Sequence, residues 1–171
     1  MIKIIKATSE DSEIIATLGQ QTFRESHGNS APKEDIDRFI LNTYNTDTIF
    51  KEFENKKALY HLLYYDNQLA GFSKIQLETP NDNITDKNIT KLDRIYLLEA
   101  FQGKQLGVAL LDFNIALSKQ HNQKGLWLVV WVENKKAIQF YNKMGFKIAG
   151  AYNFNISKTH SNPNHVMFLE Y

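Results

Sequence analysis

The feature that most constrains the fold of this chain is a continuous apolar run, Leu126 to Val132, that follows an apolar helix pattern. Such a run is typical of a strand that is buried on both faces of a sheet. The helix pattern, Leu106 to His121, itself follows another strand pattern, Leu92 to Leu98. Because a crossover helix joins two strands that run parallel in one sheet, these segments predict an α/β fold with a central parallel pair.

Weaker patterns along the chain predict the other elements. Further strands are expected at residues 2–6, 58–65, 68–77, 146–154 and 166–171, and further helices after Thr8, after Pro32, at 46–54 and at 135–144. Asp66-Asn67 predicts a hairpin turn, and residues 79–90, rich in Asn and Thr, predict a loop. No repeat or linker divides the chain, so we expect residues 1–171 to form one domain.

The composition is that of an ordinary globular protein, with 43% apolar and 23% charged residues. There is no apolar run long enough to span a bilayer, and the first residues lack the apolar region of a signal peptide. Without cysteine there is no disulfide, thiolate metal site or cysteine nucleophile. We therefore expect a cytoplasmic protein that needs no metal.

The net charge of +1 argues against a nucleic-acid or membrane partner, but the charge is unevenly distributed. Residues 10–54 hold ten acidic and four basic residues, a net of −6, whereas residues 101–150 hold seven lysines and two acids, a net of +5. This asymmetry suits an anionic cofactor and a cationic substrate. Solvated helix faces of opposite sign would account for it equally well.

Two glycines, Gly103 and Gly107, lie in the turn between the strand pattern at 92–98 and the helix pattern at 106–121. A glycine-containing turn at the start of a helix offers free backbone N–H groups and the positive end of the helix dipole. Together these groups bind phosphate. The alternative is that the glycines serve only the geometry of the chain.

A second motif follows the buried strand: Asn134-Lys-Lys-Ala-Ile-Gln-Phe-Tyr-Asn-Lys-Met-Gly-Phe146. Asn134 is a good N-cap, and Gly145 ends the predicted helix. Combined with the turn at 102–109, this segment resembles the GNAT superfamily of acyl-CoA-dependent N-acetyltransferases, whose Asn-x-x-Ala-x-x-Phe-Tyr-x-Lys-x-Gly-Phe motif it matches throughout. The resemblance covers the whole chain. It implies the GNAT fold, a twisted, mostly antiparallel mixed sheet of about seven strands flanked by helices, with a splayed parallel central pair.

Within the superfamily the chain is most similar to the PaiA-type spermidine/spermine N-acetyltransferases. The matching segments are Thr22-Phe23, Leu92-Asp93-Arg94-Ile95-Tyr96, Trp127-Leu128 with Val130-Trp131, and Gly150-Ala151 before Phe154. The implied activity is transfer of an acetyl group from acetyl-CoA to a primary amine, with a polyamine as the leading acceptor. Because dimers are common among similar enzymes, a homodimer is one expectation for the assembly.

The resemblance also implies which residues bind acetyl-CoA. They are Ile95, Tyr96 and Leu97, then Gln102, Gly103, Lys104, Gln105, Leu106, Gly107, Val108 and Ala109, and finally Asn134, Ala137, Tyr141 and Lys143. One position departs from the family pattern, because Gln105 stands where the first motif glycine is expected. A requirement for positive φ there would weaken binding. We favour an ordinary backbone conformation, in which only the N–H of Gln105 matters.

The implied chemistry is direct attack of a neutral amine on the thioester in a ternary complex. Deprotonating an alkylammonium with a pKa of about 10.4 at pH 7 costs roughly 4–5 kcal/mol, so a general base is expected. The candidates are Asp93 and Glu133, although each has the alternative of being an ordinary surface carboxylate. Tyr141 is the expected proton donor to the departing thiolate, and the backbone N–H groups near Ile95 are expected to stabilise the thioester oxygen.

Glu25, His27 and Trp131 are the candidates for binding the amine. Each has a structural alternative, as a solvated loop or helix residue or as part of the sheet core. Two other functions stay open at this point. A protein or peptide N-acetyltransferase would need an open cleft, and a CoA-binding regulatory module would have no need of Tyr141.

Overall fold

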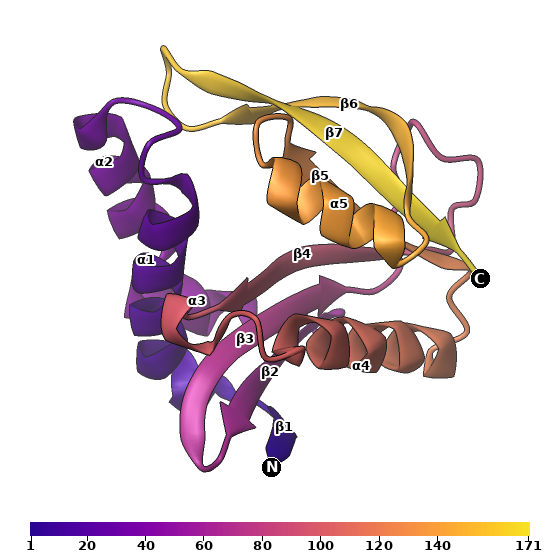
Figure 1. The fold of residues 1–171 in the computed structure, drawn as a ribbon, viewed down its shortest axis with the longest axis horizontal. Coiled ribbons are helices and arrows are strands. Elements are labelled where there is room, and N and C mark those ends of the chain that lie inside the picture. The colour runs from indigo at the N-terminus through magenta and orange to yellow at the C-terminus, as the bar shows by residue number, and fades with distance from the viewer.

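The computed structural model describes residues 1–171 and contains one seven-stranded sheet in the order β1-β2-β3-β4-β5-β7-β6 (Figure 1). The strands are β1 (Ile2–Lys6), β2 (Ala58–Tyr65), β3 (Gln68–Gln76), β4 (Thr90–Leu97), β5 (Gly125–Trp131), β6 (Lys147–Asn155) and β7 (Ser161–Glu170). The helices are α1 (Ser12–His27), α2 (Lys33–Thr43), α3 (Thr46–Glu52), α4 (Leu106–Gln120) and α5 (Lys135–Lys143), with short 3₁₀ turns η1 (Ser9–Asp11) and η2 (Glu99–Phe101). No helix has both the length and the apolar character needed to cross a membrane.

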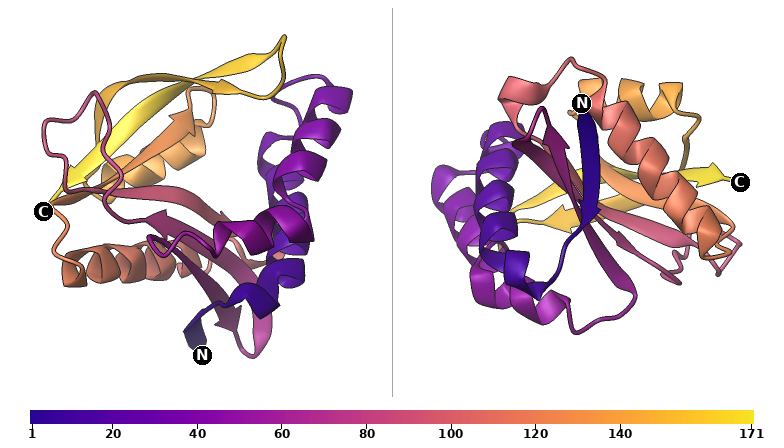
Figure 2. Two further views of the ribbon diagram at one scale, coloured as in Figure 1. Left: turned by 180° about the vertical axis from the view of Figure 1, so that it is seen from behind. Right: turned by 90° about the horizontal axis from the view of Figure 1, so that it is seen from below.

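Strands β4 and β5 form the single parallel pair of the sheet, which confirms the prediction made from the crossover helix. All other neighbouring strands pair antiparallel. The parallel pairing is short, since it joins only Thr90 to Leu126 and Lys91 to Trp127. Beyond these residues the two strands diverge, so the sheet opens into two wings (Figure 2, left).

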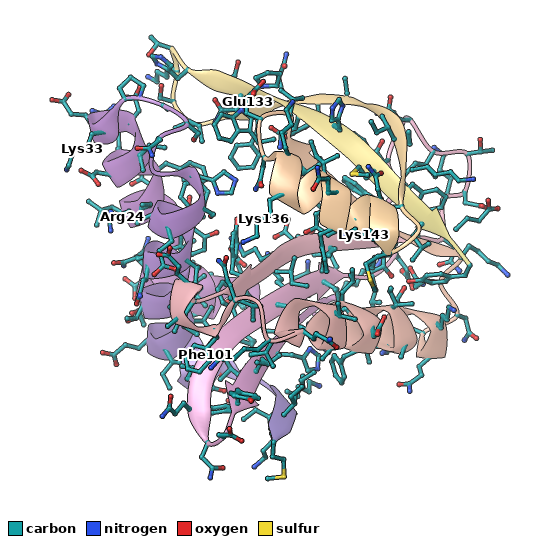
Figure 3. The ribbon with its side chains drawn as sticks, viewed as in Figure 1. Arg24, Lys33, Phe101, Glu133, Lys136 and Lys143 are labelled. Carbon is teal, nitrogen blue, oxygen red and sulfur yellow. The ribbon has the colours of Figure 1, made fainter.

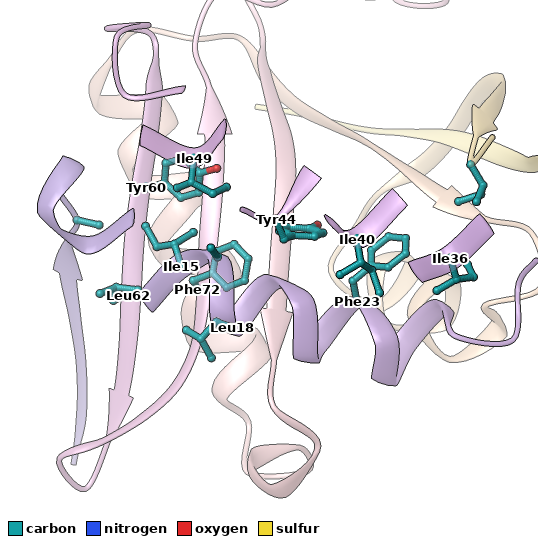
Figure 4. Packing of buried hydrophobic residues seen from close by; sticks show 13 residues of the cluster. Ile15, Leu18, Phe23, Ile36, Ile40, Tyr44, Ile49, Tyr60, Leu62 and Phe72 are labelled. Atoms are coloured by element: carbon teal, nitrogen blue, oxygen red, sulfur yellow. The ribbon is translucent and has the colours of Figure 1, made fainter. Parts of the chain in front are cut away.

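Helices cover both faces of the wing that contains β1 to β4 (Figure 2, right). Helices α1 to α3 pack on one face, where Ile15 and Leu18 lie near Leu62 and Phe72, and Phe23 lies near Ile40 (Figure 4). Helix α4 packs on the other face, where its apolar side chains contact Leu63, the residue that follows Leu62 in β2. Successive side chains of a strand point to opposite faces, so Leu62 and Leu63 connect the sheet to different helical layers.

The loop predicted at 79–90 is present but ends one residue earlier, because β4 begins at Thr90, and it covers part of the β5–β7 wing. Its Ile84 and Ile89 pack with Trp127 of β5 and Val166 of β7. The indole Nε1 of Trp127 also donates a hydrogen bond to the Thr79 carbonyl oxygen at 2.7 Å. These contacts fasten the loop to the outside of the sheet.

Strand β7 is longer than predicted, because it begins at Ser161 instead of Val166. The added residues include Pro163, which lacks the N–H that a central strand needs. Pro163 lies beyond the end of β5, whose last residue, Trp131, pairs with Asn164. The first residues of β7 therefore form a strand by pairing with β6, despite their poor strand propensity. Strand β6 itself begins and ends one residue later than predicted.

Candidate functional site

A cleft of about 650 Å³ lies where β4 and β5 diverge. Both strands, the end of α1, the turn before α4 and one side of α5 contribute to its walls. The predicted site residues that line it are Glu25, His27, Asp93, Ile95, Tyr96, Leu97, Gln102, Gly103, Gln105, Leu106, Gly107, Val108, Trp131, Asn134, Ala137 and Tyr141. Four predicted residues, Lys104, Ala109, Glu133 and Lys143, are not among the lining residues.

The turn that leads from η2 into the first residues of α4, residues 102–108, lines the cleft at every position except Lys104. The first amide of α4 with a backbone partner is that of Ala109, which donates to the Gln105 carbonyl at 3.1 Å. The amides of Leu106, Gly107 and Val108 precede it, and no side chain caps this end of the helix. Free amides at a helix start fit a phosphate group, and the absence of a side chain at Gly107 keeps the approach open.

Gln105 has a left-handed backbone, with φ of 60° and ψ of 11°. The expectation of an ordinary conformation at this position is therefore wrong. Gly103, two residues earlier in the turn between η2 and α4, also has a positive φ. A residue with a Cβ atom bears a cost of roughly 1–2 kcal/mol in this conformation, which the family glycine would avoid.

The cation beside this turn is Lys136, which the sequence did not single out. Its Nζ donates to Oε1 of Gln102 at 3.0 Å, and it lines the cleft. Lys143 lies at the opposite end of α5 (Figure 3), and Lys104 is directed at the rings of Tyr65 and Phe101, 5.1 and 5.4 Å away. The order of the elements could have identified Lys136, because helices that follow two parallel strands begin at the same edge of the sheet. The start of α5 is therefore expected beside the start of α4.

Helix α5 brings Asn134 and Tyr141 to the cleft. The Asn134 side chain accepts a hydrogen bond from the Ala137 amide at 3.1 Å, which confirms its predicted role as N-cap. The Tyr141 ring packs against Phe140 and Phe146 and is 9% exposed. Burial raises the pKa of Tyr141 well above its usual value, so the phenol keeps its proton at neutral pH.

A bulge in β4 brings Asp93 and Arg94 into one buried ion-pair network. The register with β3 shifts between Lys74 and Ile75, which leaves Asp93 without a directly paired residue. Lys74 Nζ then lies 2.6 Å from Glu52 Oε2 and 3.0 Å from Asp93 Oδ2. The Arg94 guanidinium pairs with Glu52 through both carboxylate oxygens, at 3.0 Å each. The network ties β3, β4 and α3 together beneath the cleft.

Neither carboxylate predicted as a general base is well placed for that role. Burial opposes the ionisation of Asp93, but Lys74, Lys91 and Arg94 outweigh it and hold the pKa of the carboxyl far below its usual value. A carboxylate stabilised in this way is a weak proton acceptor. The Glu133 side chain is 62% exposed, lies 4.0 Å from Lys135 Nζ and does not line the cleft.

The three residues predicted to bind the amine also line the cleft. The His27 ring stacks on Phe23 with centroids 4.7 Å apart, and the Trp131 ring lies 6.4 Å away. Glu25 Oε2 accepts a hydrogen bond from the Glu99 amide at 3.0 Å. The sequence missed the lining residues Phe154, Asn162 and Asn164, the last two because the start of β7 was not predicted.

The acidic segment 10–54 does not form an acidic wall. Asp35 pairs with His160, Asp37 with Arg24, and Glu52 with Arg94. Of the acidic residues in this segment, only Glu25 lines the cleft. The charge asymmetry of the sequence therefore does not place a cluster of acidic side chains in the cleft.

A sheet that opens between two parallel strands, beside the free amides of a helix start, defines a fold whose opening fits an anionic ligand. Residues 20–146 match the acetyltransferase (GNAT) family, and the chain belongs to this family. It is an N-acetyltransferase.

Individual relatives agree with this family. An uncharacterized N-acetyltransferase of Lactobacillus delbrueckii is 28% identical over 144 residues, which cover 84% of this chain and 83% of that protein. A spermine/spermidine N(1)-acetyltransferase of Bacillus subtilis is 33% identical over 97 residues, covering 56% and 64%. The crystal structure of a PaiA N-acetyltransferase of Thermoplasma acidophilum with coenzyme A superposes with a TM-score of 0.79 at 22% identity, covering 100% of this chain and 99% of that one. This last likeness confirms the predicted fold.

Proposed function

We propose that the protein transfers the acetyl group of acetyl-CoA to a primary amine of a polyamine such as spermidine or spermine, by direct attack in a ternary complex. The observation that carries this proposal is the continuity of the cleft, which joins the amides of the α4 turn, the Tyr141 phenol and the His27–Trp131 wall. One ligand entering from each end would bring its reactive group to the middle. The similar protein from Bacillus is named as a spermine/spermidine acetyltransferase, and the similar structure from Thermoplasma contains coenzyme A. These names supply the two ligand classes, a polyamine and a coenzyme A thioester.

The residues at the α4 turn fit the anionic half of acetyl-CoA. The free amides of Leu106, Gly107 and Val108 would bind the pyrophosphate, and Lys136 adds a positive charge beside them. The backbone of Leu92 to Leu97 that faces β5 has no strand partner beyond Lys91 and would bind the pantetheine arm as an added strand does. Acetyl-CoA supplies the activated acetyl group as a thioester.

Two groups of the protein act on the charges that develop during transfer. An unpaired amide of β4 near Ile95 would donate a hydrogen bond to the thioester oxygen as it becomes negative. Tyr141 would donate its proton to the departing sulfur, since the phenol is protonated at neutral pH. The amine nitrogen loses two protons overall, of which one ends on sulfur and the other in solvent.

Contacts between α2 and the β6–β7 hairpin favour a small amine over a protein as the acceptor. Helix α2 meets the tip of the β6–β7 hairpin (Figure 1), where the Phe39 and Phe154 rings lie 5.6 Å apart. Asp35 on α2 accepts a hydrogen bond from Ser157 at 3.2 Å and pairs with His160 at 3.0 Å. A folded protein would have to displace these contacts to reach the thioester, whereas a slender polyamine would not.

A panel of acceptors tests the proposal. Thiol release from acetyl-CoA is followed with spermidine, spermine, simple diamines and short peptides with a free amino terminus, and the products are weighed by mass spectrometry. We expect acetylated polyamines and thiol release that depends on them. Release with peptides alone would indicate a protein N-acetyltransferase, and acetyl-CoA binding without release for any amine would indicate a regulatory module.

A tyrosine pair tests the role of Tyr141 separately. Tyr141→Phe should lower kcat by about 100-fold and change the affinity for acetyl-CoA far less, because the proton is needed only as sulfur departs. Tyr152→Phe, on the exposed edge strand β6, is the matched control and should leave both quantities unchanged. Equal losses of turnover and affinity in Tyr141→Phe would contradict the donor role.

A further inference from the structure

His27 is the last residue of α1, and three aromatic side chains surround it in the cleft. Phe23 stacks on one face of the imidazole, with ring planes 15° apart. Tyr96 approaches edge-on, and Trp131 lies at a tilt, each with a centroid distance of 6.4 Å. These rings restrict the orientation of the imidazole, so its two nitrogens have fixed surroundings.

The neighbouring Ser26 decides which nitrogen carries the proton. Ser26 Oγ lies 2.8 Å from the Thr22 carbonyl oxygen and 2.7 Å from His27 Nδ1. A carbonyl oxygen only accepts, so the single hydroxyl proton of Ser26 goes to Thr22. The contact with the imidazole is then satisfied when Nδ1 carries a hydrogen and donates it to Ser26 Oγ. This arrangement leaves the lone pair of the neutral ring on Nε2.

The other nitrogen, Nε2, is free to meet a ligand. It has no hydrogen-bond partner within the protein, and it is not fully buried. Because His27 lines the cleft, a ligand there can reach this nitrogen. Burial lowers the pKa of His27 to about 4, which keeps the ring uncharged at neutral pH. His27 Nε2 is therefore an uncharged acceptor atom in the cleft, held in place by the stacking of the ring on Phe23 and by the contact at Nδ1.

We propose that His27 Nε2 accepts a hydrogen bond from the reacting amine and so directs the amine lone pair at the thioester carbon, with Ser26 as the residue that positions the tautomer. This role rests on the proposed transfer to an amine. It differs from the general-base role predicted for Asp93 and Glu133, because His27 orients an amine that is already neutral and takes no proton from it. A neutral acceptor orients the nitrogen without adding a second charge to an aromatic pocket.

The chemical step balances with the ring remaining neutral. The amine enters the reaction as R–NH₂ and donates a hydrogen bond from one N–H to His27 Nε2. The lone pair of the amine nitrogen forms the new C–N bond. The C–S bond breaks, and its electron pair leaves on sulfur, which receives a proton from Tyr141. The nitrogen then loses one proton, which restores the Tyr141 phenol by way of water.

Nitrogen NMR of the unaltered protein tests the geometry without any activity measurement. At neutral pH we expect a protonated, pyrrole-like Nδ1 and a pyridine-like Nε2 for His27. Addition of spermidine together with CoA should shift the Nε2 resonance and leave Nδ1 nearly unchanged. A proton on Nε2 would overturn the proposal, as would a charged ring or a shift confined to Nδ1.

Two amide variants of His27 test whether Nε2 orients the amine. Asn places its side-chain amide near the position of Nδ1, and Gln places it near that of Nε2. If Nε2 orients the amine, His27→Gln should retain much of the kcat with spermidine, whereas His27→Asn should lose about 100-fold. If the histidine serves only its contact with Ser26, His27→Asn should be the more active of the two, and that outcome overturns the proposal. Acetyl-CoA binding and thermal unfolding, measured on both variants, report whether the fold and the cofactor end are intact.

The failure of this proposal differs from that of the proposed function. Should the unaltered protein transfer acetyl groups to no amine at all, the proposed function fails and the orienting role falls with it. Should it acetylate spermidine while both His27 variants turn over as fast as the unaltered protein, only the role of His27 is overturned. Ser26→Ala should reduce the preference for the Nδ1–H tautomer, and an unchanged tautomer would remove Ser26 from the proposal.

Discussion

Gly103 and Gln105, two residues apart in the turn before α4, both have positive φ, of 79° and 60°. Glycine adopts this conformation at no steric cost, whereas Gln105 does not. The turn therefore keeps its shape at Gln105 against the local preference of the residue. The free amides that follow in the first turn of α4 depend on that shape.

Gln105→Gly should raise the free energy of unfolding by about 0.5–1 kcal/mol, because it removes the left-handed strain of a residue with a Cβ atom. Acetyl-CoA affinity should change by less than about threefold, since the amide of residue 105 and those of the helix start are retained. Urea unfolding and calorimetric titration measure the two quantities. A clear loss of stability in Gln105→Gly would show that the Gln105 side chain contributes more than the strain costs.

Asn134→Ala and Asn45→Ala each remove a side-chain cap at the start of a helix. Asn134 accepts from the Ala137 amide at 3.1 Å at the start of α5, and Asn45 from the Thr48 amide at 2.8 Å at the start of α3. Each loss should cost about 1 kcal/mol of stability. Only Asn134 lines the cleft, so only its variant should raise the KM for acetyl-CoA. Equal KM values in the two variants would restrict Asn134 to a structural role.

The buried network can be compared with a surface ion pair of the same length. Lys74 lies 2.6 Å from Glu52 with its side chain 5% exposed, and Lys57 lies 2.6 Å from Glu78 with its side chain 56% exposed. Lys74→Met leaves buried carboxylates short of a cation and should cost about 3 kcal/mol. Lys57→Met should cost less than about 1 kcal/mol.

The unfolding free energies of the Lys74 and Lys57 variants, measured in urea at neutral pH, decide between burial and simple charge pairing. Similar losses of unfolding free energy in both variants would contradict the idea that the buried network stabilises the β4 bulge more than a surface ion pair would. Retention of stability in Lys74→Met would mean that Arg94 and Lys91 alone compensate Glu52 and Asp93.

The sequence was sufficient for features that depend on local pattern or on element order. The parallel β4–β5 pair followed from one crossover helix, and the Asn134 cap from one residue and its position. It was insufficient where distant segments decide. Asp93 is ion-paired because a bulge brings it to Lys74 of β3, and Lys136 reaches Gln102 because α4 and α5 begin at the same sheet edge. The backbone of Gln105 was mispredicted because its conformation is imposed by the chain on either side.

Acid should destabilise the protein through His61. Its Nδ1 is buried without a partner, and its ring lies 4.7 Å from that of Phe113. Burial, with a smaller contribution from the charge of Lys6, lowers the pKa of His61 from 6.5 to about 4. The unfolded chain thus binds a proton that the folded protein does not, so stability falls as the pH drops from about 6.5 to about 4.

His61→Leu should reduce this loss. The drop in urea midpoint between about pH 7.5 and about pH 5 should be smaller in the variant than in the unaltered protein. His121→Leu, at the exposed residue after α4, is the control and should keep the full drop. An equal drop in His61→Leu and the unaltered protein would exclude His61 as a source of acid sensitivity.

Direct transfer within one cleft is tested most directly by initial rates of thiol release, with the concentrations of acetyl-CoA and spermidine both varied. The expected result is a family of intersecting double-reciprocal lines, because both ligands must occupy the β4–β5 cleft before the acetyl group moves. Parallel lines would contradict direct attack, since they indicate an acetylated enzyme formed before the amine binds. Thiol release at a rate independent of spermidine would contradict the transfer itself.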